Sequence, residues 1–139
     1  MAEKVNVNGN GAKYGFVVED KIMAYKASHR YARISARKVR PLAALVRGKP
    51  ADEALNILRF QPQRGARMLE KVIRSALGNA QDPDNPQNKG RTVDVGRLVI
   101  SEAHIDGGPM IKRIRPRARG MAYMIQKRMS HINVTLDEV

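Results

Sequence analysis

Apolar and polar side chains alternate in three stretches of the chain, as they do in strands that bury one face. These stretches are residues 22–34, residues 92–106 and the segment around residues 131–136. In the first stretch, we expect one face to carry four side chains: Tyr25, Ala27, His29 and Tyr31. In the last stretch, the expected buried face carries three: Ile132, Val134 and Leu136. The pattern therefore predicts three strands.

Three segments between these strands show helical spacing of their apolar residues. The first follows Ser35, a favourable N-cap, and stops at Gly48, a favourable helix terminator. Pro41 removes a backbone donor inside it, so the helix either bends there or begins later. The spacing of apolar residues in 50–60 predicts a second helix, which has acids in its first turn. Residues 62–81 predict the third and longest helix.

The third predicted helix is amphipathic, and Pro62 suits its first position. At about 100° per residue, six apolar residues share one side: Ala66, Leu69, Ile73, Ala76, Leu77 and Ala80. Four cations spaced three, four and three residues apart share the opposite side: Arg64, Arg67, Lys71 and Arg74. The helix is therefore expected to have one buried face and one cationic stripe.

The order of the predicted elements is strand, three helices, strand, basic ribbon and strand. This order is typical of an α+β fold, with helices on one face of an antiparallel sheet. We expect three helices packed on a small three-stranded antiparallel sheet, with a long protruding β-hairpin at about residues 98–136. Its tip is expected at about residues 107–121, where "DGGP" has turn chemistry, Pro116 blocks regular pairing and Gly120 permits a reversal.

The chain has 139 residues, which fits a single domain. Residues 1–21 are rich in Gly and Asn and predict a flexible N-terminal extension. Residues 22–139 are expected to form one domain. The N-terminal segment lacks the apolar stretch of a signal peptide, and no apolar run approaches the roughly 20 residues of a membrane span. We therefore expect a cytoplasmic protein.

The charge balance changes the picture most. The chain has 26 Lys and Arg against 13 Asp and Glu, a net charge of +13, which favours polyanions as partners. Aromatic residues are only 4%, so stacking on bases is not its main mode of recognition. The absence of cysteine excludes disulfides, zinc fingers and thiol catalysis. Nucleic acid is the first candidate partner, an anionic membrane the second, and a merely solvated surface is the remaining alternative.

A basic ribbon at residues 107–136 contains no Asp or Glu. It carries seven cations: Lys112, Arg113, Arg115, Arg117, Arg119, Lys127 and Arg128. Most are Arg, whose planar fork suits bidentate contacts with phosphate. Its glycines and prolines argue against a membrane helix, and no DNA-reading motif is evident, so RNA is favoured. A second cluster lies where a strand meets a helix N-terminus, a place that can hold a phosphate: Arg33, Arg37, Lys38 and Arg40.

Other chemistry is only weakly indicated. Three histidines lie far apart in the sequence, and structural or RNA-contacting roles are favoured over catalysis or metal binding: His29, His104 and His131. Met110, Met124 and Met129 are interpreted as gap-filling side chains rather than an adaptable binding surface. We expect no catalytic activity, no cofactor and no metal.

The segment "IDGGPMIKRIRPRARG", followed by "IQKRMSHINVTL", resembles the signature of the bacterial large-subunit ribosomal protein twenty-two family. The resemblance continues back through "ASHRYARISARKVRPLAALVRGKPADEALNILRF" and "KVIRSALGNA" and covers roughly residues 24–136. It implies a structural constituent of the large ribosomal subunit that binds 23S-type rRNA and supports early assembly. It also implies a hairpin tip that lines the nascent-peptide exit tunnel, beside ribosomal protein four of the large subunit near the constriction.

The resemblance assigns the tunnel tip to nine residues: Ile111, Lys112, Arg113, Pro116, Arg117, Ala118, Arg119, Gly120 and Met121. Together with the cation clusters, it assigns RNA binding to Arg33, Arg37, Lys38, Arg40, Arg64, Arg67, Lys71, Arg74, Lys112, Arg113, Arg115, Arg117, Arg119, Lys127, Arg128 and His131. Two residues depart from the family pattern. Met121 stands where Arg is usual, which lowers the charge expected at the tip. Pro41 stands where a branched aliphatic residue is usual.

Two other functions remain as alternatives. A free RNA- or DNA-binding protein of the chaperone type would remain soluble or enter the nucleoid fraction. An enzyme acting on RNA would show turnover that depends on one of the three histidines.

Overall fold

The computed structural model describes residues 24–86, 88 and 93–139. The expected extension at residues 1–21, the start of the first predicted strand and part of the loop at residues 82–94 lie outside the described residues. The described part contains three strands, three α-helices and two short 3-10 helices: β1 (Tyr25–Ala32), α1 (Ala36–Val46), α2 (Ala51–Phe60), α3 (Arg64–Gln81), η1 (Val95–Arg97), β2 (Leu98–Pro116), η2 (Ala118–Gly120) and β3 (Ala122–Glu138).

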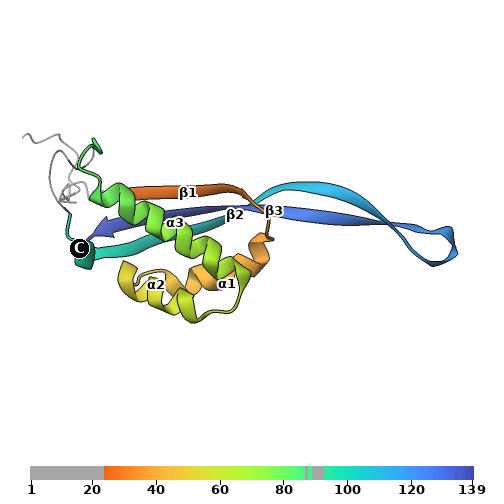
Figure 1. Ribbon diagram of the computed structural model, residues 1–139, viewed down its shortest axis with the longest axis horizontal. Helices are drawn as coiled ribbons and strands as arrows, with labels where there is room; N and C mark the ends of the chain where they lie inside the picture. The colour runs from red at the N-terminus through yellow and green to blue at the C-terminus, as the bar shows by residue number, and fades with distance from the viewer. Residues whose placement is uncertain (1–23, 87, 89–92) are drawn as a thin grey trace, which may run out of the picture.

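The strands form one antiparallel sheet in the order β1-β3-β2, so β3 is the central strand. The helices lie on one side of the part of the sheet that contains β1, and β2 and β3 continue far beyond them (Figure 1). The burial of β3 reflects this arrangement, because even-numbered residues from Ser130 to Leu136 are buried and those between them are half-buried. The predicted α+β class, with its long hairpin, is confirmed.

The core lies between the helices and the sheet. All six apolar residues expected on one side of α3 are buried: Ala66, Leu69, Ile73, Ala76, Leu77 and Ala80. They belong to the same cluster as Ile132, Val134 and Leu136 of β3. Burial of each larger apolar side chain contributes about 1.5–3 kcal/mol, which makes this shared layer the main source of stability. The helix itself begins at Arg64 rather than at Pro62.

The first helix runs through Pro41. It begins at Ala36 after the N-cap Ser35, and Pro41 lies inside it with its ring exposed to solvent. The alternative of a later start is therefore wrong. Gly48 follows the helix with φ +76°, and its N–H donates to the carbonyl of Ile100 at 2.8 Å. This bond fixes the end of α1 to β2.

Single-residue bulges shift the strand patterns away from simple alternation. In β1, the register slips between His29 and Ala32, and Tyr31 adopts φ +58°. Ala32 is therefore buried and Tyr31 is exposed, so the prediction that Tyr31 shares a face with Tyr25 is wrong. In β2, a second slip after Ile100 moves the buried positions from even to odd numbers.

The hairpin is paired almost to its end. Residues 107–109 belong to β2, where an extra residue forms a bulge between Gly107 and Met110. The expected interruption of the first arm at "DGGP" is present as this bulge, but the segment does not reverse the chain. Pairing continues to Pro116 and Ala122, so the strands are joined by residues 117–121 alone, a shorter connection than expected. The reversal uses Arg119 at φ +60° and Gly120 at φ +67°, which supports the prediction of a reversal in "RPRARG".

Replacement of Gly48 tests how far the end of α1 depends on a left-handed backbone. A Cβ at Gly48 meets no atom within 4 Å, so Gly48→Ala changes only conformational strain. We expect it to lower the free energy of unfolding by about 1 kcal/mol. Gly78→Ala is the control, because this exposed helical glycine also has open space around it. It should raise stability by about 0.5–1 kcal/mol. Urea unfolding measures both, and equal effects would contradict the assignment.

Candidate nucleic-acid interface

The distal hairpin exposes its cations without counter-charges. Residues 109–124 are all exposed, and the segment 107–136 has no carboxylate. Among the described residues, none of its seven Lys and Arg side chains forms an ion pair: Lys112, Arg113, Arg115, Arg117, Arg119, Lys127 and Arg128. A two-stranded ribbon has no core of its own that could offset the repulsion between them. A polyanionic partner removes that repulsion.

Both faces of the hairpin carry cations. Because cross-strand partners share a face, the register places Arg113, Arg115 and Lys127 on the same side of the ribbon. Tyr123 pairs with Arg115 on this face, and its ring lies 5.7 Å from the guanidinium carbon of Arg117. This cation–π contact orients Arg117 at the start of the turn. This face therefore presents three cations, next to the apolar side chains of Ile111 and Ile125, to any ligand that lies along it.

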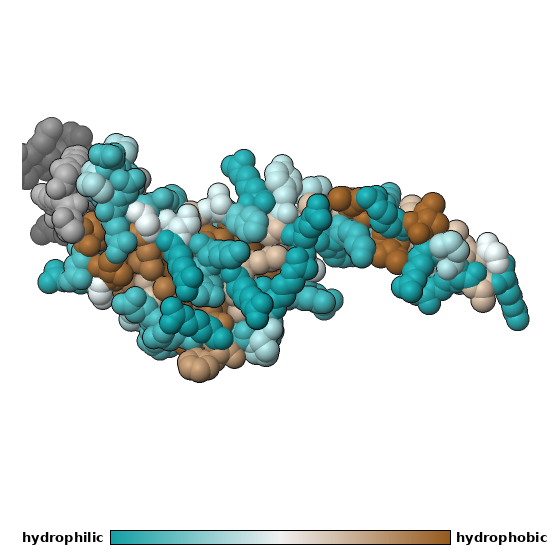
Figure 2. Space-filling model, viewed as in Figure 1, coloured by the Kyte–Doolittle hydropathy of each residue, from teal (hydrophilic) through white to brown (hydrophobic). Residues whose placement is uncertain are grey.

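The opposite face carries Lys112 and Arg128 and is also partly apolar. Ile114 pairs with Met124 there, and both are strongly exposed, at 69% and 62%. Met110 is also about half exposed, so the gap-filling interpretation of Met110 and Met124 is wrong. Figure 2 shows hydrophobic patches between hydrophilic side chains along the hairpin. The even-numbered β3 positions on this face continue the face that is buried from Ser130 to Leu136.

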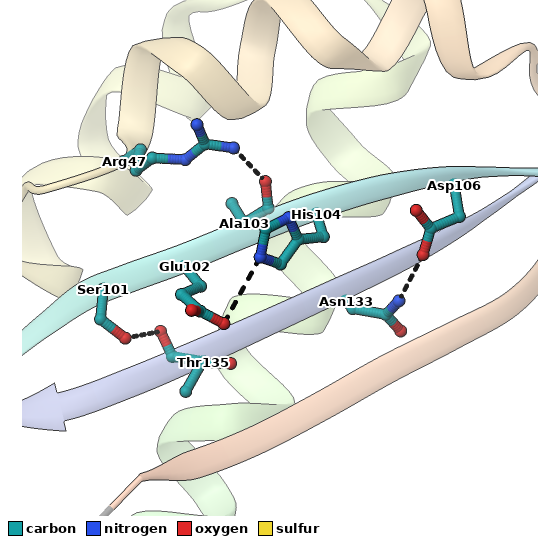
Figure 3. A network of polar contacts seen from close by, with 8 residues as sticks. All are labelled: Arg47, Ser101, Glu102, Ala103, His104, Asp106, Asn133 and Thr135. Atoms are coloured by element: carbon teal, nitrogen blue, oxygen red, sulfur yellow. Dashed lines mark hydrogen bonds and ion pairs between the residues drawn. The ribbon is translucent and has the colours of Figure 1, made fainter. Parts of the chain in front are cut away.

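Acidic residues of β2 remain on the body and are already engaged. Glu102 lies 3.4 Å from the imidazole of His104, and Asp106 accepts a hydrogen bond from the Asn133 side chain at 3.1 Å (Figure 3). Arg47, which sequence reasoning did not single out, donates to the carbonyl of Ala103 at 2.7 Å. The acids end at Asp106, just before the hairpin leaves the helices. Along β2, the acids therefore lie beside the helices and the cations lie on the projecting part.

The hairpin base and two helix starts enclose a cleft of about 1100 Å³. Six of the predicted RNA-binding cations line this cleft: Arg33, Lys38, Arg64, Arg113, Lys127 and Arg128. They come from the β1–α1 connection, α1, α3, β2 and β3, although they are spread over nearly one hundred positions of sequence. Arg37 and Arg40 are exposed but do not line it, and Arg40 donates to the carbonyl of Ile105 at 3.4 Å.

The cationic stripe of α3 is only partly free. All four of its members are exposed, but the guanidinium of Arg74 lies 2.7 Å from the carboxylate of Glu70. Arg59 approaches the same carboxylate at 3.9 Å. The spacing of Glu70 and Arg74, one helical turn apart, is a sequence signal for this pair. Within the described residues, Arg64, Arg67 and Lys71 form no ion pair, so these three cations remain available to a polyanion.

His131 holds the base of the hairpin together. Its Nδ1 accepts the backbone N–H of Tyr31 at 3.1 Å, and the two rings meet edge to face at 4.9 Å. A Cβ at Gly108 would lie 3.3 Å from Nε2, so the bulge of β2 approaches the same ring closely. His131 therefore connects all three strands, and this structural role supplements the RNA contact predicted for it.

Other kinds of site are not indicated by the described residues. No group of three or more His, Asp or Glu within them could hold a metal ion. No helix in this part of the chain is both long and apolar enough to span a membrane. Burial raises the pKa of Tyr25, with a smaller contribution from the charge of Glu138. Tyr25 pairs with Leu136 in the core, away from the hairpin cations.

Comparison with known proteins identifies the family. The family described as "Ribosomal protein L22p/L17e" matches residues 27–137. The chain is 64% identical over 115 residues to "Large ribosomal subunit protein uL22" of Rhodopirellula baltica, which covers 83% of this chain and 95% of the relative. It is 53% identical over 112 residues to the protein of that name from Caldicellulosiruptor saccharolyticus, with 81% and 86% covered.

A third relative of the same name, from Maridesulfovibrio salexigens, is 50% identical over 117 residues, which are 84% of this chain and all of that protein. The chain therefore belongs to the L22p/L17e family of ribosomal proteins. The family resemblance inferred from the hairpin motif is confirmed.

Replacement of His131 tests whether it fixes the β1 bulge. His131→Ala removes the acceptor of the Tyr31 N–H, so we expect the free energy of unfolding to fall by about 1–2 kcal/mol. Hydrogen exchange at the Tyr31 amide should accelerate more than exchange at other β1 amides. His104→Ala is the control, because its exposed pair with Glu102 contributes little. Unchanged exchange at Tyr31 in His131→Ala would contradict this role.

Proposed function

We propose that this chain is a structural constituent of the large ribosomal subunit that binds the large-subunit rRNA. Support comes from its family, from relatives named as large-subunit proteins and from its net charge of +13. One observation carries the proposal further than the family does: the projecting hairpin exposes seven cations that form no ion pair within the described residues. Phosphates would neutralise these charges, release counterions and accept charge-assisted hydrogen bonds.

The shape of the hairpin supports a position between RNA helices. The ribbon is two strands wide, and small residues at its end, Ala118, Gly120 and Ala122, keep it thin. Its tip would line the nascent-peptide exit tunnel, beside ribosomal protein four of the large subunit. The segment from Ile111 to Arg113 lies on the arm of the hairpin rather than in the turn, and Ile111 and Arg113 line the cleft beside the body, so the tunnel-facing part would be the end of the hairpin around residues 116–121.

This assignment makes the protein a non-catalytic component of the ribosome in the cytoplasm. Its anchoring cations on the body and its hairpin would bind RNA during early assembly of the subunit. No cofactor or metal takes part in the proposal. The nascent peptide would meet the tip, where Met121 is 57% exposed and lowers the charge offered to the tunnel.

Salt dependence of RNA binding tests the phosphate contacts. Affinity for a transcript of the large-subunit rRNA should fall by about 10³-fold or more between about 50 and 200 mM salt, if six or more phosphates are engaged. Replacing Lys112, Arg113, Arg115, Arg117 and Arg119 with Gln should make this dependence shallower. Lys49→Gln with Arg97→Gln is the control, because both cations pair with acids. Filter binding measures each slope.

A flat salt dependence of the unmodified chain would contradict phosphate-dominated binding.

The location of the protein provides an independent check. It should sediment with large-subunit particles in magnesium after a high-salt wash. Recovery in the soluble or nucleoid fraction would instead support a free nucleic-acid chaperone.

A further inference from the structure

The cleft at the hairpin base differs from the hairpin tip because both the body and the hairpin line it. The starts of α1 and α3 form one side, and the arms of the hairpin form the other. Hydrophilic side chains cover the region where the hairpin leaves the body (Figure 2). A ligand in the cleft would contact the body and the hairpin at the same time.

The cleft is positive without any local compensation. It is lined by the six cations Arg33, Lys38, Arg64, Arg113, Lys127 and Arg128, and no carboxylate lines it. Among the described residues, none of the six belongs to an ion pair. Cations that converge from five segments raise the local potential more than the same number spread along a ribbon, because their fields add inside the cleft. Such a site favours a ligand with several adjacent negative charges.

Two helix starts add donors at the same place. Ser35 and Gln63, the N-caps of α1 and α3, both line the cleft, and neither makes a side-chain capping bond. Neither helix has an acid in its first turn, whereas α2, which starts elsewhere, has Asp52 and Glu53 there. First-turn N–H groups without side-chain caps are suited to anions. They supplement the cation cluster, which remains the main observation.

The rest of the lining distinguishes RNA from a simple inorganic anion. Ile34, Pro41, Ile111 and Met129 supply apolar surface beside the cations. Ribose and base edges can lie against such a surface while phosphates meet the charged groups. A cleft of about 1100 Å³ is also much larger than one phosphate requires.

We propose that this cleft is the principal RNA site of the protein: a segment of rRNA backbone passes through it and joins the body to the hairpin. The inference rests on the proposed function and adds where the main contact lies. Lys38, Arg64 and Lys127 hold phosphates from α1, α3 and β3, and the occupied cleft fixes the direction in which the hairpin leaves the body. The cations of the tip contribute less to affinity, because they lie on an open ribbon.

Two variants with equal loss of charge test this ranking. The cleft variant combines Lys38→Gln, Arg64→Gln and Lys127→Gln, and the tip variant combines Arg115→Gln, Arg117→Gln and Arg119→Gln. All six side chains are exposed, so both variants should fold, as circular dichroism and thermal unfolding would verify. With the full-length large-subunit rRNA transcript at one salt concentration, the cleft variant should lose at least about tenfold more affinity than the tip variant. Equal losses, or a greater loss in the tip variant, would overturn the inference and leave the proposed function intact.

A tethered probe locates the RNA directly. The chain has no cysteine, so Lys38→Cys gives one attachment point for a hydroxyl-radical source. We expect it to cut the bound transcript strongly at a few neighbouring nucleotides. Asp52→Cys is the control, because it lies in the acidic first turn of α2 and should cut weakly. Equal cutting from both positions would overturn the inference.

Two further outcomes show whether the proposed function or only the inference about the cleft is wrong. If the unmodified chain does not bind the transcript, both the proposed function and this inference are wrong. If the cleft variant binds RNA normally but loses binding to poly-glutamate, the cleft holds an acidic protein segment, and the inference alone is wrong.

Discussion

The pairing of β2 with β3 is the constraint on which the rest of the molecule depends. Near the helices, this ladder forms one side of the core, where Ile100 and Ile105 of β2 lie in the same buried cluster as Ile132 of β3. Beyond Gly107 the same two strands continue far past the helices. The body therefore supplies the packing that the hairpin lacks, and the hairpin is directed by strands whose other ends are fixed. A bulge at Gly107–Met110, held against His131, marks the place where the two parts meet.

The distribution of charge follows this division. Several acids of the body have local partners, as Glu70 has in Arg74 and Glu102 has in His104. The hairpin and the cleft at its base have cations but no acids to pair with them. A surface on which acids and cations pair is stable without a partner. A surface of unpaired cations is destabilised by their mutual repulsion unless a polyanion supplies the missing charge, so the positions of the acids indicate which surfaces meet RNA.

Much of the fold could be predicted from local patterns. The buried face of α3 and the buried positions of Ile132, Val134 and Leu136 follow from periodicity alone, because each element has one face toward one core. Bulges could not be predicted in this way, since an extra residue is defined by the partner strand rather than by its own sequence. The segment Gly107–Pro109 has turn chemistry, yet pairing with β3 resumes beyond it. The exposure of Met124 likewise depends on the hairpin leaving the helices behind.

The residues of the candidate site could be predicted from the sequence, but their position together in one cleft could not. Lys38, Arg64 and Lys127 were each expected to contact RNA, and only the tertiary fold brings them to one cleft. A density map of the large ribosomal subunit that contains this chain tests the central claim most directly. Our account predicts RNA backbone phosphates in contact with these three side chains, and rRNA along the cations of the hairpin. An empty cleft with the hairpin cations facing solvent would contradict it.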